Sequence, residues 1–337
     1  METVVVAEQS TDPRTAASVP PRWRSLLGRQ WFLLLLVIVA ISVFTGLNNS
    51  RFYSRANLLN ILEQVSVLGL VAAGATILIV SGNFDISVGA VIGLAAVIMA
   101  KMIAGGSNLL LAVGVGIAIG IACSLTNGFL SIAFKAPSFI ISLAMIGVYH
   151  GIALATTEGT IQTIYGQFEG LGSKDVFGLI PLIFLISVGG YVFIHVIMKH
   201  TALGRALFAI GSNPNAAFLA GINVRRRTLS FFALNGLLVG AAAVLLLSRL
   251  GAALPSTGTG LELTAIGAAV IGGIPITGGR GDAIGTFFGV LLMGVISNSL
   301  NMLRVSPYHQ EIATGTVIIG AIGISFLRHR INKNSEL

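Results

Sequence analysis

Long apolar segments are the feature of this sequence that most restricts its fold. A helix needs about 20 predominantly apolar residues to cross the hydrocarbon core of a bilayer. The shortest candidate is the eighth of the segments found, which lie at about 31–47, 58–80, 86–104, 109–133, 138–155, 178–198, 228–250, 262–274, 283–303 and 309–327. We therefore predict an all-α, polytopic bundle of about ten transmembrane helices.

The composition excludes an ordinary water-soluble domain. Only 9% of the residues are charged and 55% are hydrophobic, whereas about a quarter of the residues of a typical soluble domain are charged. The net charge of +8 does not indicate nucleic-acid binding, because most basic residues lie in polar stretches between the apolar segments. Cys123 is the only cysteine, so an intrachain disulfide is excluded and redox chemistry has no support.

The distribution of Lys and Arg predicts the orientation of the spans. With the N-terminus inside, most of the 20 Lys and Arg residues fall in cytoplasmic connections, where membrane proteins carry their excess of positive charge. An even number of spans then also keeps the C-terminus inside. We expect a flexible cytoplasmic tail at 1–30, a transmembrane domain at 31–327 and a cytoplasmic tail at 328–337. The first apolar segment has no cleavage pattern after it, which predicts a retained helix.

Two glycine-rich breaks interrupt the apolar pattern, at 82–89 and 272–282. Backbone that leaves helical geometry at membrane depth must be buried in protein or line a watery cavity. Glycine-interrupted apolar segments in the two halves of a membrane protein indicate a transport pathway between repeats. The two breaks are only loosely similar in sequence, so an internal repeat is an open possibility.

Six polar residues are candidates for the pathway: Asn83, Asp85, Ser87, Asn127, Asn235 and Glu262. Asp85 is either a polar group on the substrate route or a cap for the third helix. Glu262 is either a favourable first-turn acid of the eighth helix or part of a gate. Asn127 and Asn235 either form hydrogen bonds between helices or contact hydroxyl groups of a substrate.

The connection at 199–227 contains the signals of a short helix. Asn213 suits the N-cap, Pro214 the first helical position and Gly221 the position after the helix end, so we predict a helix at 214–220. A helix this short needs a partner surface. It either packs against its own bundle or docks into a separate cytoplasmic protein. The docking residues would be Asn213, Pro214, Asn215, Ala216, Ala217, Phe218, Leu219, Ala220 and Gly221.

The sequence lacks the motifs of common catalytic sites. It has no G-x-x-x-x-G-K-[ST] loop for a nucleotide phosphate and no G-x-S-x-G elbow. The five histidines show no spacing with Asp, Glu or Cys that suits a metal site. We therefore expect no enzyme, cofactor or metal site, and any ATP must be bound by another chain.

Several segments resemble the ribose-type (monosaccharide) permeases of binding-protein-dependent ABC importers. The similarity runs from about residue 57 to 327 and is strongest in five motifs taken together. They are G-N-F-D-I-S-V-G at 82–89, A-P-S-F-I-I-S-L at 136–143, G-R-A-L-F-A-I-G-S-N-P-N-A-A-F-L-A-G-I-N-V at 204–224, A-A-V-I-G-G-I-P-I-T-G-G-R-G at 268–281 and N-S-L-N-M-L-R-V-S-P-Y-H-Q at 298–310. The family typically has Gly-Ile-Asp-Leu where this chain has Asn83-Phe84-Asp85-Ile86, a departure that bears on substrate identity if this loop faces the pathway.

The resemblance implies a permease subunit in the bacterial inner membrane that moves a monosaccharide or similar polyol. Its implied partners are a second permease copy, a cytoplasmic ABC ATPase and an extracytoplasmic sugar-binding protein. The helix at 213–221 would be the coupling helix in the ATPase groove, within a coupling loop at 199–227. A branched-chain amino-acid importer permease and an ion-coupled secondary transporter are the alternatives. A membrane enzyme is disfavoured by the absent catalytic motifs.

Overall fold

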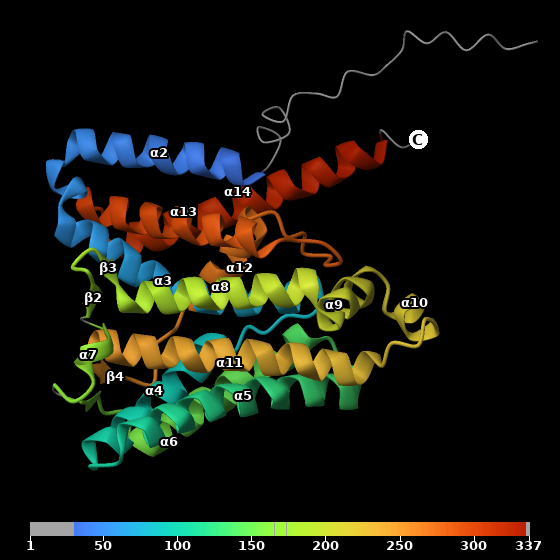
Figure 1. Ribbon diagram of the computed structural model, residues 1–337, viewed down its shortest axis with the longest axis horizontal. Coiled ribbons are helices and arrows are strands. Elements are labelled where there is room, and N and C mark those ends of the chain that lie inside the picture. Colours follow the sequence, from blue (N-terminus) through green and yellow to red (C-terminus); the bar gives the residue numbers. More distant parts are fainter. Residues whose placement is uncertain (1–29, 165, 173, 335–337) are drawn as a thin grey trace, which may run out of the picture.

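The structure is a computed structural model that describes residues 30–164, 166–172 and 174–334. Its helices run close to the long axis of the molecule (Figure 1). The helices of the first half are α2 (Gln30–Asn48), η1 (Ser50–Tyr53), α3 (Arg55–Val80), α4 (Val88–Ala104), α5 (Leu109–Phe134) and α6 (Ser138–Thr157). Those of the second half are α7 (Glu169–Gly172), α8 (Leu182–His200), α9 (Ala202–Ser212), α10 (Pro214–Leu219), α11 (Val224–Leu250), α12 (Leu261–Ile271), α13 (Ala283–Met302) and α14 (Pro307–Asn334).

The predicted helical membrane bundle is confirmed, but not its count of spans. In the described part of the chain, seven helices are long and apolar enough to cross a membrane, namely α2, α3, α5, α6, α8, α11 and α13. Helix α4 is shorter, and α12 has only 11 residues. The expected eighth span at 262–274 is thus only a half-length helix that ends at Ile271, because Gly272 and Gly273 follow it.

The two ends of the bundle differ in what they carry. The start of α2 and the end of α14 lie on the side that also carries α9 and α10 (Figure 1). The expected tail at 1–30 falls almost entirely outside the described residues. Helix α14 continues through 328–334, most of the stretch expected as the second tail, and the rest of that stretch is outside the described residues.

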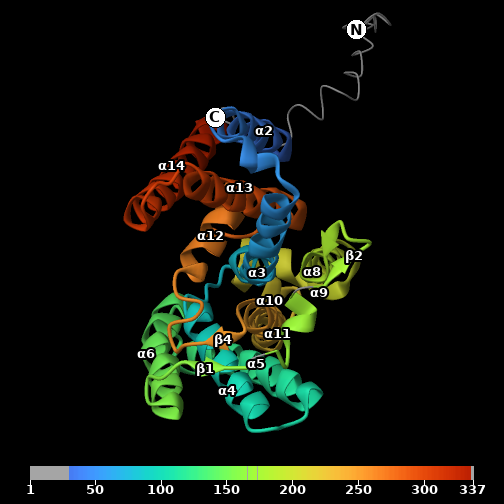
Figure 2. The ribbon, with the colours of Figure 1, turned by 90° about the vertical axis from the view of Figure 1, so that its left-hand side faces the viewer.

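Short strands cover the opposite end, which faces the viewer in Figure 2. Strand β1 (Gln162–Thr163) pairs antiparallel with β4 (Ala252–Ala253), and β2 (Asp175–Val176) pairs antiparallel with β3 (Ile180–Pro181). The predicted outer connection at 156–177 therefore holds two of these strands and α7. It is tied to the segment after α11 by the β1–β4 pair.

The core of the bundle is built around α3 and α11. In α3, 83% of an 18-residue apolar stretch is buried inside the chain itself, between α11, α8, α13 and α12. Helix α11 approaches α5 through glycines: a methyl group added to Gly120 would lie 2.5 Å from the carbonyl oxygen of Gly236 and 2.6 Å from the amide nitrogen of Gly240. Small residues permit such close approach of helices in membranes, which accounts for part of the high glycine content.

Candidate functional site

The two glycine-rich breaks begin with the same main-chain turn. At the end of α3, Gly82 has φ +78° and donates to the carbonyl of Ile79, while Asn83 donates to Leu78. The end of α12 repeats this pattern: Gly273 donates to the carbonyl of Val270 and Ile274 to that of Ala269. Gly273 has φ +102°. This is the Schellman arrangement, in which a left-handed residue satisfies the last helical carbonyls. The same arrangement also ends α4, α10 and α13, so it is a general helix ending and the internal repeat stays a prediction.

A buried carboxyl group organises the first break. Asp85 is 6% exposed and accepts hydrogen bonds from five donors. Its Oδ1 accepts from the Ser87 amide at 3.0 Å, the Ser87 hydroxyl at 2.6 Å and Asn127 Nδ2 at 3.1 Å. Its Oδ2 accepts from Ser124 Oγ at 3.4 Å and Asn235 Nδ2 at 3.3 Å. We call Asp85, Ser87, Ser124, Asn127, Tyr149 and Asn235 the Asp85 network.

The Asp85 network joins three helices to the first break. Asn127 also donates to Ser87 Oγ at 2.8 Å and accepts from the Tyr149 hydroxyl at 2.9 Å. Asn235 also donates to Ser124 Oγ at 3.0 Å. Ser124 and Asn127 lie on α5, Tyr149 on α6 and Asn235 on α11. Among the described residues no ion pair involves Asp85, so neutral donors alone compensate its burial.

Two serines of α6 satisfy main-chain donors of the same break. The amide of Phe84 donates to Ser138 Oγ at 2.9 Å, and the amide of Ile86 donates to Ser142 Oγ at 3.0 Å. Both serines are buried. Non-helical backbone at membrane depth must find partners within the protein, and these serines supply them.

Asp85 was expected either to cap the third helix, which is α4, or to lie on the substrate route, and the structure bears on the first of these. Asp85 does fix the start of α4, but its Oδ1 accepts from Ser87, which is itself the N-cap and makes no side-chain cap bond. Asp85 therefore binds the N-cap residue Ser87 and is not itself the N-cap of α4. Asn127 and Asn235 form the hydrogen bonds between helices that were one of the two expectations, since Asn127 accepts from Tyr149 of α6 and Asn235 donates to Ser124 of α5. Their role on a substrate pathway stays a prediction.

Two predicted pathway residues lie apart from the Asp85 network. Asn83 is half-buried and donates to Ser81 Oγ at 3.0 Å. Glu262 lies in the first turn of α12, as expected, and both its carboxylate oxygens accept from the Gly260 amide at 3.1 Å. Its Oε2 also lies against Gly89 of α4, where no side chain would fit.

The second break contains an acid in different surroundings. Asp282 is the N-cap of α13, and its side chain accepts from the Ile284 amide at 3.3 Å. Its side chain is 44% exposed and lies 3.5 Å from His195 Nδ1 and 3.7 Å from Lys199 Nζ, both on α8. A histidine, a lysine and a capping bond thus take the place of the buried neutral donors of the first break.

The predicted short helix in the 199–227 connection is confirmed as α10. Asn213 is its N-cap and accepts from Asn215 and Ala216, Pro214 is its first residue, and Gly221 after its end has φ +83°. Ala217 is buried, so α10 is supported by its own chain. Phe218 and Leu219 are 69% and 85% exposed, which leaves these two apolar side chains available to a partner.

Helix α9, which precedes α10, was not predicted. Its signals are present in the sequence: Thr201 is the N-cap and accepts from the Gly204 amide at 3.1 Å, and Ala206, Leu207 and Ile210 form a buried face at helical spacing. These signals lie in a connection between spans, where an additional helix was not expected.

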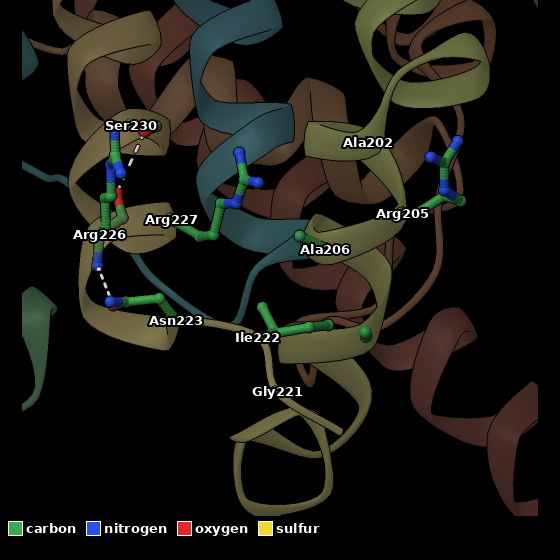
Figure 3. A pocket seen from close by; sticks show the side chains of 10 residues that line it. Ala202, Arg205, Ala206, Gly221, Ile222, Asn223, Arg226, Arg227 and Ser230 are labelled. Atoms are coloured by element: carbon green, nitrogen blue, oxygen red, sulfur yellow. Dashed lines mark hydrogen bonds between the residues drawn. The ribbon is translucent and has the colours of Figure 1, made fainter. Parts of the chain in front are cut away.

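A pocket of about 740 Å³ lies behind α10. It is lined by residues of α9, the turn at Gly221 and the start of α11. Figure 3 shows the side chains of Arg205, Arg226 and Arg227 on the side of the pocket away from Gly221. None of these arginines is in an ion pair with a described residue. The pocket therefore presents positive charge beside the exposed helix.

Four network or break residues were missed by sequence reasoning: Ser124, Tyr149, Ser138 and Ser142. The two α6 serines lie four residues apart in the segment at 136–143, a spacing that puts them on one helix face. Their partners are main-chain groups 54 and 56 residues away, which the sequence does not reveal. Within the ranges that the structure describes, no group of three His, Cys, Asp or Glu residues could hold a metal ion.

Comparison with known proteins gives a consistent family. Residues 57–322 match the family described as branched-chain amino acid transport system / permease component. The ribose import permease protein of Bacillus subtilis is 38% identical over 293 residues, which cover 86% of this chain and 89% of the relative. The fructose import permease protein of Rhizobium meliloti is 32% identical, with 95% and 93% covered.

A third relative, the L-arabinose transport system permease protein of Escherichia coli, is 32% identical and covers 91% of this chain and 94% of its own length. No solved structure shows a significant match. The matched region includes both breaks, the Asp85 network and α10. The chain therefore belongs to this family of transport-system permease components.

Proposed function

We propose that this protein is the transmembrane permease subunit of an ATP-driven importer for a monosaccharide or similar polyol. The observation that carries the proposal is a capped, apolar and exposed helix, α10, on a permease whose relatives are named for the import of ribose and of fructose and for the transport of L-arabinose. A binding protein would deliver the sugar on the outer side. A second permease copy would complete the pathway.

The α10 surface supports docking of a separate ATPase. Phe218 and Leu219 are large apolar side chains that face solvent, and an amphipathic helix in a hydrophobic groove is a common mode of recognition. The Asn213 cap and Pro214 hold this short helix in shape before the partner binds, which lowers the ordering cost of association. ATP hydrolysis would take place on that partner.

The charge around α10 also favours an acidic partner surface. No Asp or Glu occurs between Asp175 and Glu262, and the pocket behind α10 is lined by Arg205, Arg226 and Arg227. Complementary charge steers association and selects partners. We expect acidic residues around the apolar groove of the ATPase.

We also infer ten crossings with both termini in the cytoplasm of a bacterial inner membrane. The start of α2 and the end of α14 lie on the same side of the molecule as α9 and α10 (Figure 1). An even number of crossings would produce this arrangement. Helix α4, the α12 half-helix with the non-helical stretch before it, and α14 would add the three remaining crossings. The basic α9–α11 connection would then lie inside, as the positive-inside rule expects.

The six polar residues predicted for the pathway remain part of this proposal. Four of them, Asp85, Ser87, Asn127 and Asn235, are buried and bonded to one another or to Ser124. We propose that they hold the helices that frame the pathway, and that substrate would reach them only after those helices move. Asn83 and Glu262 are partly exposed and would meet substrate first.

A branched-chain amino-acid substrate is the second candidate, because the family description names that system. The curated relatives favour the sugar, since three of them have different sugars in their names. The matches to these three cover 89%, 93% and 94% of the relatives' own lengths. Uptake of radiolabelled sugars and of leucine by the reconstituted importer separates the two. Leucine uptake without sugar uptake would overturn the substrate class.

Co-purification of the ATPase tests the docking role. We expect Phe218→Asp to reduce the ATPase recovered with the tagged permease by tenfold or more, since about 1.4 kcal/mol of lost contact suffices. The matched control is Phe177→Asp, a change of a 95% exposed phenylalanine in the β2–β3 hairpin at the opposite end. Full ATPase recovery with the Phe218 variant would contradict docking at α10.

A further inference from the structure

Three segments from distant parts of the chain meet at the end of α3. The carbonyl oxygen of Val80 accepts from the amide of Gly279 at 2.9 Å. Ser212 Oγ donates to the carbonyl oxygen of Gly279 at 3.4 Å. A methyl group added to Gly211 would overlap the Val80 carbonyl oxygen and lie 2.8 Å from the Gly279 nitrogen. We call Val80, Gly211, Ser212 and Gly279 the glycine joint.

The members of the glycine joint come from three different functional segments. Val80 is the last residue of α3 and leads into the first break. Gly279 lies in the second break and has φ +78°. Gly211 and Ser212 end α9, directly before Asn213, the N-cap of α10. The joint therefore lies one intervening residue before the proposed ATPase-docking helix, one intervening residue before the first break and within the second break.

The contacts in the joint are close enough to transmit a displacement. A methyl group at Gly278, beside Gly279, would lie 2.8 Å from the Ile79 carbonyl oxygen and 3.0 Å from the Gly82 nitrogen. The neighbours are main-chain atoms, which cannot rotate away as a long side chain can. Packed interiors have little free space and transmit strain, and rigid elements in direct contact can link distant sites.

We propose that the glycine joint is the mechanical link between the ATPase-docking helix α10 and the two breaks of the permease. It requires glycine at 211 because any side chain would separate α9 from Val80 and Gly279. Gly211 and Ser212 are thus positioning residues for coupling, since they touch neither substrate nor nucleotide. This inference rests on the proposed importer function.

The test is Gly211→Ala, with Gly189→Ala as its matched control. Gly189 is an exposed α8 residue where a methyl group would meet nothing within 4 Å. Both changes replace glycine in a helix with a better helix former, so only the contact differs. The importer would be reconstituted with its ATPase and binding protein in liposomes, and three quantities measured: ATPase recovery, ATP hydrolysis and sugar uptake.

We expect Gly211→Ala to keep ATPase recovery and hydrolysis near those of Gly189→Ala. Sugar taken up per ATP hydrolysed should fall by about five- to 150-fold, the usual range of coupling between sites. An assembled Gly211→Ala importer with the same uptake per ATP as Gly189→Ala would overturn the joint. Failure of the unmodified chain to retain an ATPase would instead overturn the proposed function.

A milder variant covers the case in which Gly211→Ala does not fold. Ser212→Ala removes the hydrogen bond to Gly279 and adds no atoms. Its control is Ser230→Ala, which removes a bond to the Arg226 carbonyl at 3.1 Å nearby but outside the joint. We expect lower uptake per ATP for the Ser212 variant only. Equal uptake per ATP in both serine variants would overturn the proposal.

Discussion

The two breaks start with the same Schellman turn but are held in different ways. In the first break, side chains from α5 and α11 bond the Asp85 carboxyl group, and α6 serines bond the amides of Phe84 and Ile86. In the second, glycines with left-handed backbone lie against α3, and the acid Asp282 is exposed beside His195 and Lys199.

This difference indicates that the two breaks have different roles. The first is fixed by buried hydrogen bonds, each expensive to leave unmade. The second depends on main-chain contact and on surface charges, which contribute little. We therefore regard the first break as a fixed framework and the second as the freer element, joined to it at the glycine joint. Four substitutions test this contrast.

The largest effect should follow removal of the Asp85 carboxyl group. Asp85→Ala leaves five donors without their acceptor, and each buried unsatisfied group costs about 1–3 kcal/mol. We expect the free energy of unfolding in detergent to fall by at least about 3 kcal/mol, with two or more donors unable to reach another acceptor. Asp85→Asn, which keeps the shape and one acceptor, should lose less. Equal stability of Asp85→Ala and the unmodified chain would refute the framework role.

A smaller loss is expected at α6. Ser142→Ala removes the acceptor of the Ile86 amide and should lower the free energy of unfolding by about 1–3 kcal/mol. Thr126→Val is the control, because Thr126 is exposed and bonds only its own helix, and its effect should stay within about 0.5 kcal/mol. Both can be measured by the same unfolding titration. Indistinguishable variants would mean that the serine does not hold the break.

The acid of the second break should matter less than that of the first. Asp282→Ala removes the α13 N-cap, a loss of about 0.5–2 kcal/mol, while its exposed ion pairs add little. A side-by-side unfolding titration with Asp85→Ala checks the order. If the Asp282 variant is the less stable of the two, the contrast between the breaks is reversed.

The smallest effect is expected from the charge facing Asp282. Lys199→Gln should lower the free energy of unfolding by no more than about 1 kcal/mol, because both side chains are nearly half exposed. Salt screens such pairs, so the difference should vanish at high ionic strength. A difference that persists in 1 M salt would show that this pair is not a surface interaction.

The sequence predicted the features that depend on local pattern. The positions of most spans follow from apolar length, and the ends of α10 follow from Asn213, Pro214 and Gly221, whose capping roles need only neighbouring residues. Both breaks were found from their glycines. The half-length of α12 was not predicted, because the apolar stretch at 262–274 continues beyond Ile271, where the Schellman turn ends the helix.

The contacts between distant segments could not be predicted. Asp85 was singled out, but its partner Ser124 and the Tyr149 that bonds Asn127 lie on other helices and carry no local signal. The meeting of Val80 with Gly279 joins residues nearly 200 positions apart through main-chain atoms, which every residue possesses. Such contacts depend on how the helices pack, and a single sequence does not specify that.

Amide hydrogen exchange of the assembled importer tests the central contrast most directly. Exchange would be compared between peptides covering 81–87 and 276–282, with and without ATP bound to the partner. Amides in buried hydrogen bonds exchange only when their segment opens, so we expect strong protection at 81–87 in both states. We expect faster exchange at 276–282 and a change there when ATP binds. Equal protection of the two breaks, unchanged by ATP, would contradict the account.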